Sequence, residues 1–464
     1  MQRLTRTACL AFTLGTLVPL AQGQDLAPRS AALSVEQPPE QKSILPELTL
    51  EQAIELAVAN NSSLKTASLE TQRAADDLAA NRTRRFANTQ LTGLGAQLVT
   101  KPSVTFPAGS LGTYSATGPI PGTDQKIEIA RKPVGSVNVL VAQPLSAQYQ
   151  LHLQLKALAL GLEGTRQDQE RTRLEMIDQV RRAYYTVVEA QSALDSLQAS
   201  LPYYEESHRL ALENHRKETI LESDLLNADT QLLKIQNAIS DASDKVASAS
   251  EGLNDLMGRD IHTQFRVAAV GDIDANPITP EMEDRALQNR PDLKKAKLQV
   301  QQAHYDARAK KAEYIPEVSL AFSYYTTANF ENVLPSNIGT VGLSLKWEPW
   351  DWGRKRQEYA EKRVKEEQAK VGVDATERAV LLETRNACRQ LENTRRELAL
   401  SDATERAARQ KLEEVQVQVK RQAVLSRDLF QAQSDLASAD SQQQQSLAAF
   451  WKARADLQKA IGEE

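Results

Sequence analysis

Two long heptad seams, one in each half of the chain, are the feature that most constrains its fold. Apolar residues recur with alternating spacings of four and three from Leu221 to Leu256, and the same pattern returns from Leu425 to Ala460. A seam sustained over about five heptads is typical of a coiled coil. Leu alternates with Ala along much of it, which allows neighbouring helices to approach closely. We therefore expect each half to contain a long helix packed along a helical partner.

The two seams belong to an internal duplication, which must be recognised before a fold is assigned. Leu-Glu-Ser-Asp-Leu at 221–225 returns as Leu-Ser-Arg-Asp-Leu at 425–429, an offset of 204 residues. The same offset relates further pairs of identical residues: Arg181 and Arg385, Ala228 and Ala432, Gly258 and Gly462. The chain is therefore expected to consist of two tandem copies of one unit.

The duplication predicts how the chain is divided. We expect a first repeat at 47–260 and a second at 281–464, joined by a linker at 261–280. Blocks near the start of each repeat are 229 residues apart rather than 204, so the first repeat contains extra residues. These fall in a stretch at 101–133 that is rich in Gly, Pro and Thr. Each repeat is expected to contain a helix, two strands and long helices, in that order.

Four segments alternate apolar with small or polar residues, which predicts strands with two unlike faces. They span about 88–99 and 135–143 in the first repeat, and about 317–325 and 339–347 in the second. The 88–99 segment has the weaker pattern, with Leu94, Ala96 and Leu98 as its apolar side. Segments of ~8–10 residues are long enough for a tilted strand to cross a bilayer. A half-buried sheet in a soluble domain has the same pattern, so the strands alone leave both interpretations open.

The N-terminus predicts export from the cytoplasm. Arg3 and Arg6 precede an apolar stretch at 8–20, and Ala-Gln-Gly at 21–23 has the small residues that a signal peptidase requires. Residues 1–23 are therefore expected to be a cleaved signal peptide, and residues 24–46 a flexible leader. No Cys follows the apolar stretch at the cleavage site, so we expect no lipid anchor.

Composition excludes several classes of function. The mean hydropathy of −0.47, and the lack of later apolar runs of ~18 residues, argue against a bundle of membrane helices. With 56 Lys and Arg against 61 Asp and Glu, no basic excess is available to bind nucleic acid. The sequence contains no Gly-rich phosphate loop, nucleophile elbow or HExxH motif. We therefore expect the protein not to be an enzyme and to need no cofactor or metal.

The strands and long helices together imply an assembly. Four strands cannot close a barrel with an open lumen, and unpaired sheet edges are not tolerated in lipid, so several chains would have to pool their strands. In this combination the chain resembles the TolC-type outer membrane efflux and secretion channels. The motifs that carry the resemblance extend over both repeats: Leu-Thr-Leu-Glu-Gln-Ala-Ile at 48–54, Asn-Arg-Pro-Asp-Leu at 289–293, Tyr-Ile-Pro at 314–316, Glu-Pro-Trp-Asp-Trp-Gly-Arg at 348–354, and the two Leu-x-x-Asp-Leu segments.

The resemblance implies a mainly α protein with a trimeric, 12-stranded transmembrane β-barrel, four strands per protomer, which continues into a long α-helical coiled-coil tunnel in the periplasm. Its function would be that of an outer membrane exit duct of a tripartite efflux pump or type I secretion system, conducting substrates passively. The implied partners are two further copies of the chain, a periplasmic adaptor (membrane fusion) protein, an inner membrane transporter and outer membrane lipid. The alternative is a periplasmic coiled-coil scaffold or adaptor with a small β domain. A wide water-filled tunnel needs no substrate pocket, so the sequence does not identify the substrate.

Candidate site residues follow from the resemblance at the periplasmic tips of the helical hairpins. Asp224 and Asp428 match the turn aspartates of the family, and the Asp428 position would contribute to an acidic ring at a constricted entrance. The second ring aspartate of the family corresponds to Gln431, which implies a ring of three charges rather than six. The tip glycines of the family are replaced by Glu218 and Gln422, which leaves the shape of the turns and their fit to an adaptor open. Helix N-capping is the alternative role for both aspartates.

Three of the 4 Trp residues, Trp347, Trp350 and Trp352, lie where the last predicted strand gives way to a helix. An interfacial aromatic belt would occupy this position in a membrane barrel. A hydrophobic plug between the barrel and the helices is the alternative. Gly353 is expected to allow the tight turn into the helix.

Overall fold

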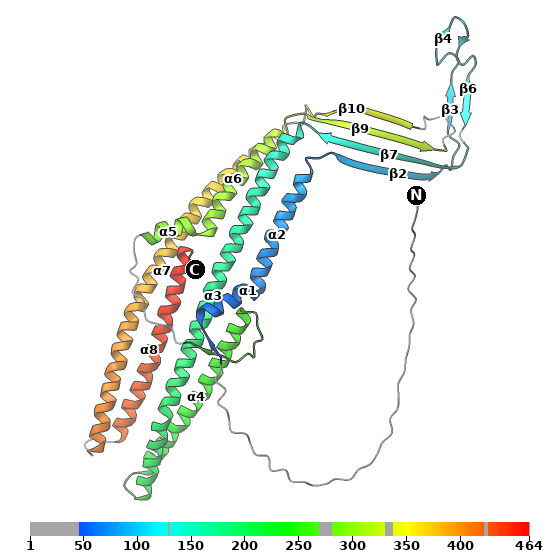
Figure 1. The fold of residues 1–464 in the computed structure, drawn as a ribbon. Helices are drawn as coiled ribbons and strands as arrows, with labels where there is room; N and C mark the ends of the chain where they lie inside the picture. Colours follow the sequence, from blue (N-terminus) through cyan, green and yellow to red (C-terminus); the bar gives the residue numbers. More distant parts are fainter. Residues whose placement is uncertain (1–45, 129, 269–280, 330–336, 422–425, 464) are drawn as a thin grey trace, which may run out of the picture. The chain divides into compact units, whose positions relative to one another are not determined.

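The computed structural model describes residues 46–128, 130–268, 281–329, 337–421 and 426–463. All of these belong to one compact unit, Leu45–Glu464, whereas the predicted signal peptide, and the leader up to residue 45, lie outside the described residues. The unit contains long helices and an antiparallel four-stranded sheet (Figure 1). Among the described helices, none combines the length and apolarity that crossing a membrane would require.

Helices follow the same order in both halves of the chain. Those of the first half are α1 (Leu50–Asn60), α2 (Ser62–Thr83), α3 (Ala147–Arg216) and α4 (Glu222–Leu256). Those of the second half are α5 (Glu281–Asn289), α6 (Pro291–Ala312), α7 (Arg354–Lys420) and α8 (Ser426–Ile461). Helix α1 begins with a capping box in which the Thr49 hydroxyl accepts from the Gln52 amide and the Gln52 side chain accepts from the Thr49 amide.

The four-stranded sheet has the order β10–β9–β7–β2, with every neighbouring pair antiparallel. A strand lies in each segment where the sequence predicts one: β2 (Asn88–Gln97), β7 (Pro133–Pro144), β9 (Glu317–Ala328) and β10 (Asn337–Lys346). Two further antiparallel pairs lie in the Gly/Pro/Thr-rich insertion: β3 (Ser103–Phe106) with β6 (Gln125–Glu128), and β4 (Thr113–Tyr114) with β5 (Gly118–Pro119). Composition alone did not predict these short strands, because Gly and Pro are generally depleted in strands. The last pair, β1 (Glu47–Leu48) and β8 (Arg266–Val267), is parallel.

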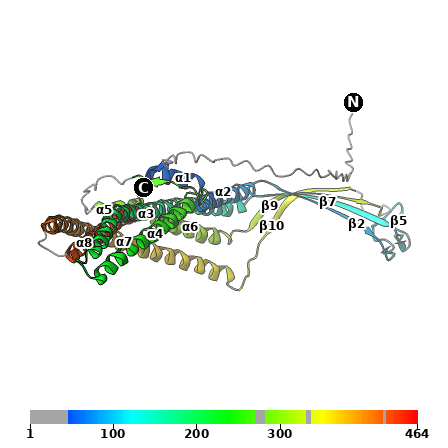
Figure 2. The ribbon, with the colours of Figure 1, turned by 90° about the horizontal axis from the view of Figure 1, so that it is seen from below.

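The row of helices next to the sheet has the same order as the strands. Strand β2 follows α2, β7 leads into α3, β9 follows α6, and β10 leads into α7. The helices pack in the corresponding sequence, α2 on α3, α3 on α6, and α6 on α7 (Figures 1 and 2). Further along, α4 packs on α3, α8 packs on α7, and α3 contacts α8. Both rows therefore end on the same elements, α2 with β2 on one side and α7 with β10 on the other.

The heptad seams mark the packed faces of α4 and α8, as the sequence predicts. Along α4 the seam residues are buried or half-buried, with Ala228, Ile235, Ala242 and Leu253 the most enclosed. The described part of the second seam, from Leu429 onward, is likewise buried or half-buried. Helix α3 continues through Pro202 without interruption, although this residue cannot donate the backbone hydrogen bond expected at that place.

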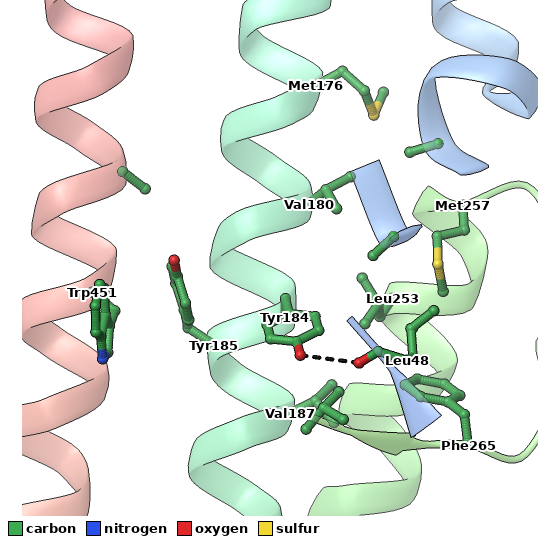
Figure 3. Close-up of a cluster of buried hydrophobic side chains, with 14 of the residues drawn as sticks. Leu48, Met176, Val180, Tyr184, Tyr185, Val187, Leu253, Met257, Phe265 and Trp451 are labelled. Atoms are coloured by element: carbon green, nitrogen blue, oxygen red, sulfur yellow. Dashed lines mark hydrogen bonds between the residues drawn. The ribbon is translucent and has the colours of Figure 1, made fainter. Parts of the chain in front are cut away.

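The main hydrophobic core joins the two halves of the chain. Its residues come from α1, β1, α3, α4, β8, α7 and α8, and Figure 3 shows most of them. The buried Tyr184 hydroxyl can donate to the carbonyl oxygens of Leu48 (3.0 Å) and Ala268 (3.1 Å), and so holds the β1–β8 pair against α3. The ring of Tyr185 stacks on Trp451 of α8 at a centroid distance of 5.8 Å. This core positions α3 and α8 against each other at the boundary between the halves.

Two glycines at matching positions of the two halves make similar backbone contacts. Gly258 follows α4 and Gly462 follows α8, and both have a left-handed backbone, with φ of 65° and 79°. A Cβ atom on Gly258 would lie 3.0 Å from the carbonyl oxygen of Asn60, at the end of α1. A Cβ atom on Gly462 would lie 3.2 Å from the backbone nitrogen of Arg290, next to the end of α5. Each half of the chain therefore closes its last helix against its first by the same glycine contact.

Candidate functional site

The register of the sheet separates its side chains into two unlike faces, because directly paired residues point to the same side. One face, here called the apolar face, consists chiefly of Leu91, Val137, Val139, Val141, Leu320, Phe322, Tyr324, Val341, Leu343 and Leu345. The opposite face, here called the polar face, contains mainly small and polar side chains: Asn88, Gln90, Thr92, Ser136, Asn138, Ser319, Ser323, Thr327, Thr340 and Ser344.

The prediction for the first strand chose the wrong side as apolar. Leu94 pairs with Ser136, so Leu94 and Ala96 lie on the polar face of the sheet. Leu91 pairs with Val139 and contributes to the apolar face instead. Period-two alternation within one strand sorts its residues into two sets, but only pairing with a neighbouring strand decides which set joins the apolar face.

The apolar face is left uncovered by the described part of the chain. Leu91, Val341 and Leu343 are 72%, 73% and 72% exposed, and none of the described helices packs broadly on the sheet. Strands β2 and β10 each have one paired neighbour among the described residues, so each leaves one edge open. A contiguous apolar surface of this kind marks contact with a membrane or with another protein, and an open edge is a template for further strand pairing.

The three tryptophans lie on the outside of the turn between β10 and α7. Trp347, Trp350 and Trp352 are 60%, 73% and 90% exposed, and the rings of Trp350 and Trp352 meet edge to face at 5.8 Å.

The turn itself is held by one carboxylate. Asp351 accepts hydrogen bonds from the backbone amides of Lys355 and Gly353, both at 3.0 Å, and these bonds lower the pKa of its carboxyl group. Trp352 and Gly353 have φ of 55° and 85°, so Gly353 lies in the tight turn for which the sequence predicts it.

The tip between α3 and α4 contains Glu218 and Asp224. Glu218 is exposed and has a left-handed backbone, with φ of 56°. Helix α4 has Leu221 at its N-cap, with no side-chain cap, and Asp224 is an exposed residue of its first turn. The alternative role of Asp224, as the N-cap of this helix, is therefore wrong. Its charge lies instead where the N-terminal end of the helix dipole favours an anion.

The tip between α7 and α8 is described in part. Gln422 lies outside the described residues, while Asp428 is a half-buried residue in the first turn of α8. Gln431, one turn further on, is exposed and donates a hydrogen bond from Nε2 to Asp435 Oδ1 at 2.7 Å. The two tips therefore present Asp224 and Asp428 at equivalent places in α4 and α8.

The Glu218→Gly variant is expected to stabilise the α3–α4 tip by ~1 kcal/mol, because a left-handed backbone costs an L-residue about 1–2 kcal/mol and glycine nothing comparable. Hydrogen exchange of the amides around the turn, which slows when the tip opens less often, would measure the gain. Ser223→Gly, inside the first turn of α4, is the matched control and is expected to speed exchange. Faster exchange in Glu218→Gly would contradict the assignment of strain to this residue.

Within the described ranges, no group of three or more His, Cys, Asp and Glu side chains is arranged to hold a metal ion. The features of this site are thus surfaces and edges: an open sheet with unlike faces, an exposed tryptophan turn and two acidic helix tips.

The fold is shared with several solved channels. The outer-membrane channel OprN is 17% identical, with a TM-score of 0.74 over 89% of this chain and 90% of that one. The Campylobacter jejuni outer membrane channel CmeC is 17% identical, with a TM-score of 0.73 over 93% of this chain and 90% of that one. The open state of the Neisseria gonorrhoeae outer membrane channel MtrE is 17% identical, with a TM-score of 0.70 over 89% of each chain.

Sequence comparisons assign the family. An uncharacterized protein of Haemophilus influenzae is 24% identical over 222 residues, which is 47% of this chain and 48%, about half, of the relative. The model of the family described as "Outer membrane efflux protein" matches residues 133–259 and 283–463, which is more than half of the chain. The resemblance predicted from the motifs is thereby confirmed: the chain belongs to the outer membrane efflux protein family.

Proposed function

We propose that this protein is the outer membrane exit duct of a tripartite efflux pump or type I secretion system, through which substrates pass without energy input from the duct itself. The observation that carries the proposal is the open four-stranded sheet, whose apolar face is exposed and whose two edges lack partners within the described chain. A sheet with these properties is incomplete in a single chain, and membership of an outer membrane efflux family supplies the setting in which it would be completed.

A homotrimer would satisfy both open edges at once. Helix α2 and strand β2 lie at one end of the two rows, and α7 and β10 lie at the other end. A single rotation can therefore place the β10 of a neighbouring copy beside β2 and its α7 beside α2. Such a head-to-tail contact closes into a ring when the rotation is cyclic. Three copies would provide twelve strands, an even number as in bacterial outer membrane barrels. We also propose that the mature chain consists of two repeats, at 47–260 and 281–464.

The two sheet faces suggest how the barrel would be oriented. The apolar face would contact outer membrane lipid, and the polar face would line the lumen. Trp347, Trp350 and Trp352 would form an aromatic belt at the membrane surface nearer the helices. The helices would continue the lumen as a periplasmic tunnel, and their tips would contact a periplasmic adaptor and, through it, an inner membrane transporter.

Reconstitution of the purified protein in planar bilayers tests this function. We expect extraction from the outer membrane fraction to require detergent, the purified protein to be trimeric, and its insertion to produce ion conductance. Solubility in plain buffer together with no conductance would favour the alternative, a periplasmic coiled-coil scaffold or adaptor. Deletion of the gene, followed by a panel of drugs, dyes, metals and secreted proteins, would identify the substrate.

Asp428 is proposed to contribute one carboxylate per chain to the acidic ring at the entrance. In Asp428→Ala, block of the channel by added multivalent cations is expected to weaken about fivefold, as for the loss of ~1 kcal/mol from one charge contact in water. Gln431→Asp, which would double the ring charge, is expected to strengthen the block. Dose–response curves for block at fixed ionic strength measure both effects. Unchanged block in both variants would exclude these positions from the entrance.

A further inference from the structure

A cavity of about 200 Å³ lies between the two halves of the chain. It is next to the aromatic contact of Tyr185 with Trp451, on the side toward the C-terminal end of α3 and the N-terminal end of α8. Helices α3 and α8 form its two main walls, and Leu412 of α7 closes one side. Several of the facing residues are small, such as Ala193 and Ser196 on α3 and Ala437 on α8. Where small side chains on α3 face small side chains on α8, they do not fill the space between the two helices.

One buried hydrogen-bond acceptor at the cavity lacks a donor. Gln433 of α8 lines the cavity and is 7% exposed, and its buried Oε1 atom has no hydrogen-bond partner among the described residues. Asp440, two turns further along α8, is the one charged residue among those that line the cavity. Because a buried acceptor without a donor costs free energy, a ligand that donates hydrogen bonds would be favoured here.

The surroundings of Asp440 favour a cation. The carboxylate of Glu405 from α7 repels the negative charge of Asp440, while Arg409 attracts it. Arg409 is itself ion-paired with Glu405, so its charge is already shared. Burial first, and then Glu405, raise the pKa of Asp440. A cation in the cavity would stabilise the ionised form of this carboxyl group.

We propose that this cavity binds a small organic cation, a protonated amine carried on an apolar body. The ammonium group would donate to Asp440, and the rings of Tyr203 and Tyr204, which also line the cavity, offer faces for a cation. The apolar body would occupy the space between Leu197 and Leu436. An apolar cavity of about 150 Å³ holds a benzene molecule, so this one is large enough for a single ring with a short amine chain.

Binding of 2-phenylethylamine, which is a cation at pH 7, to the purified full-length protein in detergent tests the proposal. Calorimetric titration is expected to show saturable binding, at least about tenfold tighter than that of the neutral 2-phenylethanol, because hydrogen bonds to a charged group contribute about 1.5–3 kcal/mol. Asp440→Asn is expected to weaken the binding of the amine about tenfold or more and to change that of the alcohol less than about twofold.

Two further variants locate the site. Asp435→Asn removes the same charge from the same helix, but Asp435 does not line the cavity, so amine binding is expected to be unchanged. Ala437→Phe is expected to fill the cavity and abolish the binding of both compounds. Ala193→Leu, from the α3 wall, serves the same purpose if Ala437→Phe does not assemble, as judged by gel filtration.

Three results would overturn the proposal: no saturable binding of the amine, equal affinity for amine and alcohol, or amine binding that persists in the filled variants. Since each is a binding measurement on the isolated protein, none depends on whether the protein conducts ions. A failure here would therefore leave the proposed exit duct untouched, and absence of conductance would leave the cavity assignment untouched.

Discussion

Leu343→Arg is expected to prevent stable insertion of the protein into the outer membrane, whereas Ser344→Arg, one residue further along β10, is expected to be tolerated. Leu343 pairs with Leu320 on the apolar face, and Ser344 pairs with Ser319 on the polar face. An Arg that faces lipid at the bilayer midplane of a β-barrel costs about 2–4 kcal/mol, and a trimer would incur that cost three times. An Arg that faces a water-filled lumen avoids most of this desolvation.

Outer membrane fractionation and trimer formation measure the effect of the two substitutions. Leu343→Arg should be depleted from the outer membrane fraction and recovered largely as aggregated or degraded protein. Ser344→Arg should fractionate like the unmodified protein and alter ion selectivity, because it would add a charge to the lumen. Equal behaviour of the two variants would contradict the assignment of lipid and lumen to the two faces of the sheet.

Gly258→Ala and Gly462→Ala are each expected to destabilise the protein by ~2 kcal/mol or more. A left-handed backbone alone costs an Ala about 1–2 kcal/mol. The new Cβ atom would also lie 3.0 Å from the Asn60 carbonyl oxygen in the first case and 3.2 Å from the Arg290 nitrogen in the second. Both neighbours are backbone atoms, so neither contact is relieved by rotation of a side chain.

Urea unfolding followed by circular dichroism measures the loss of stability in both glycine variants. The matched control is Gly252→Ala within α4, where no atom lies within 4 Å of the added Cβ. That change is expected to be stabilising by about 0.5–1 kcal/mol, because Ala is the better helix former. If Gly258→Ala unfolded at the same urea concentration as Gly252→Ala, the close contact with Asn60 would not be important for stability.

Local patterns predicted much of the secondary structure. The heptad seam of α4 and the alternation in β9 are properties of short windows of sequence, so they can be recognised without knowing what packs against them. The insertion between β2 and β7 was different, because its strands are short and rich in Gly, Pro and Thr. The choice of Leu94 over Leu91 as apolar was wrong for a related reason: the glycines at 93 and 95 hide the apolar face of that strand.

The candidate site was predicted unevenly. Trp347, Trp350 and Trp352 lie on an exposed turn, their role as an aromatic belt stays a prediction, and Gly353 adopts the backbone that the turn needs. The sequence correctly placed Asp224 near the start of a helix, but the N-cap of that helix is Leu221. The position of the cap depends on where the chain leaves the turn at Glu218, which the local pattern does not show. The cavity beside Gln433 and Asp440 had no sequence signal, since its walls come from helices more than 200 residues apart in the chain.

The sequence by itself determined that this chain has two equivalent halves, long paired helices and strands with unlike faces, because duplication and periodicity are written into consecutive residues. Only the tertiary structure decided which strand edges stay open, which face of the sheet is mainly apolar, and that the helix row has the same order as the strands. The physical reason is that these properties depend on hydrogen bonds and packing between segments far apart in the chain. A local pattern restricts those contacts but does not select among them.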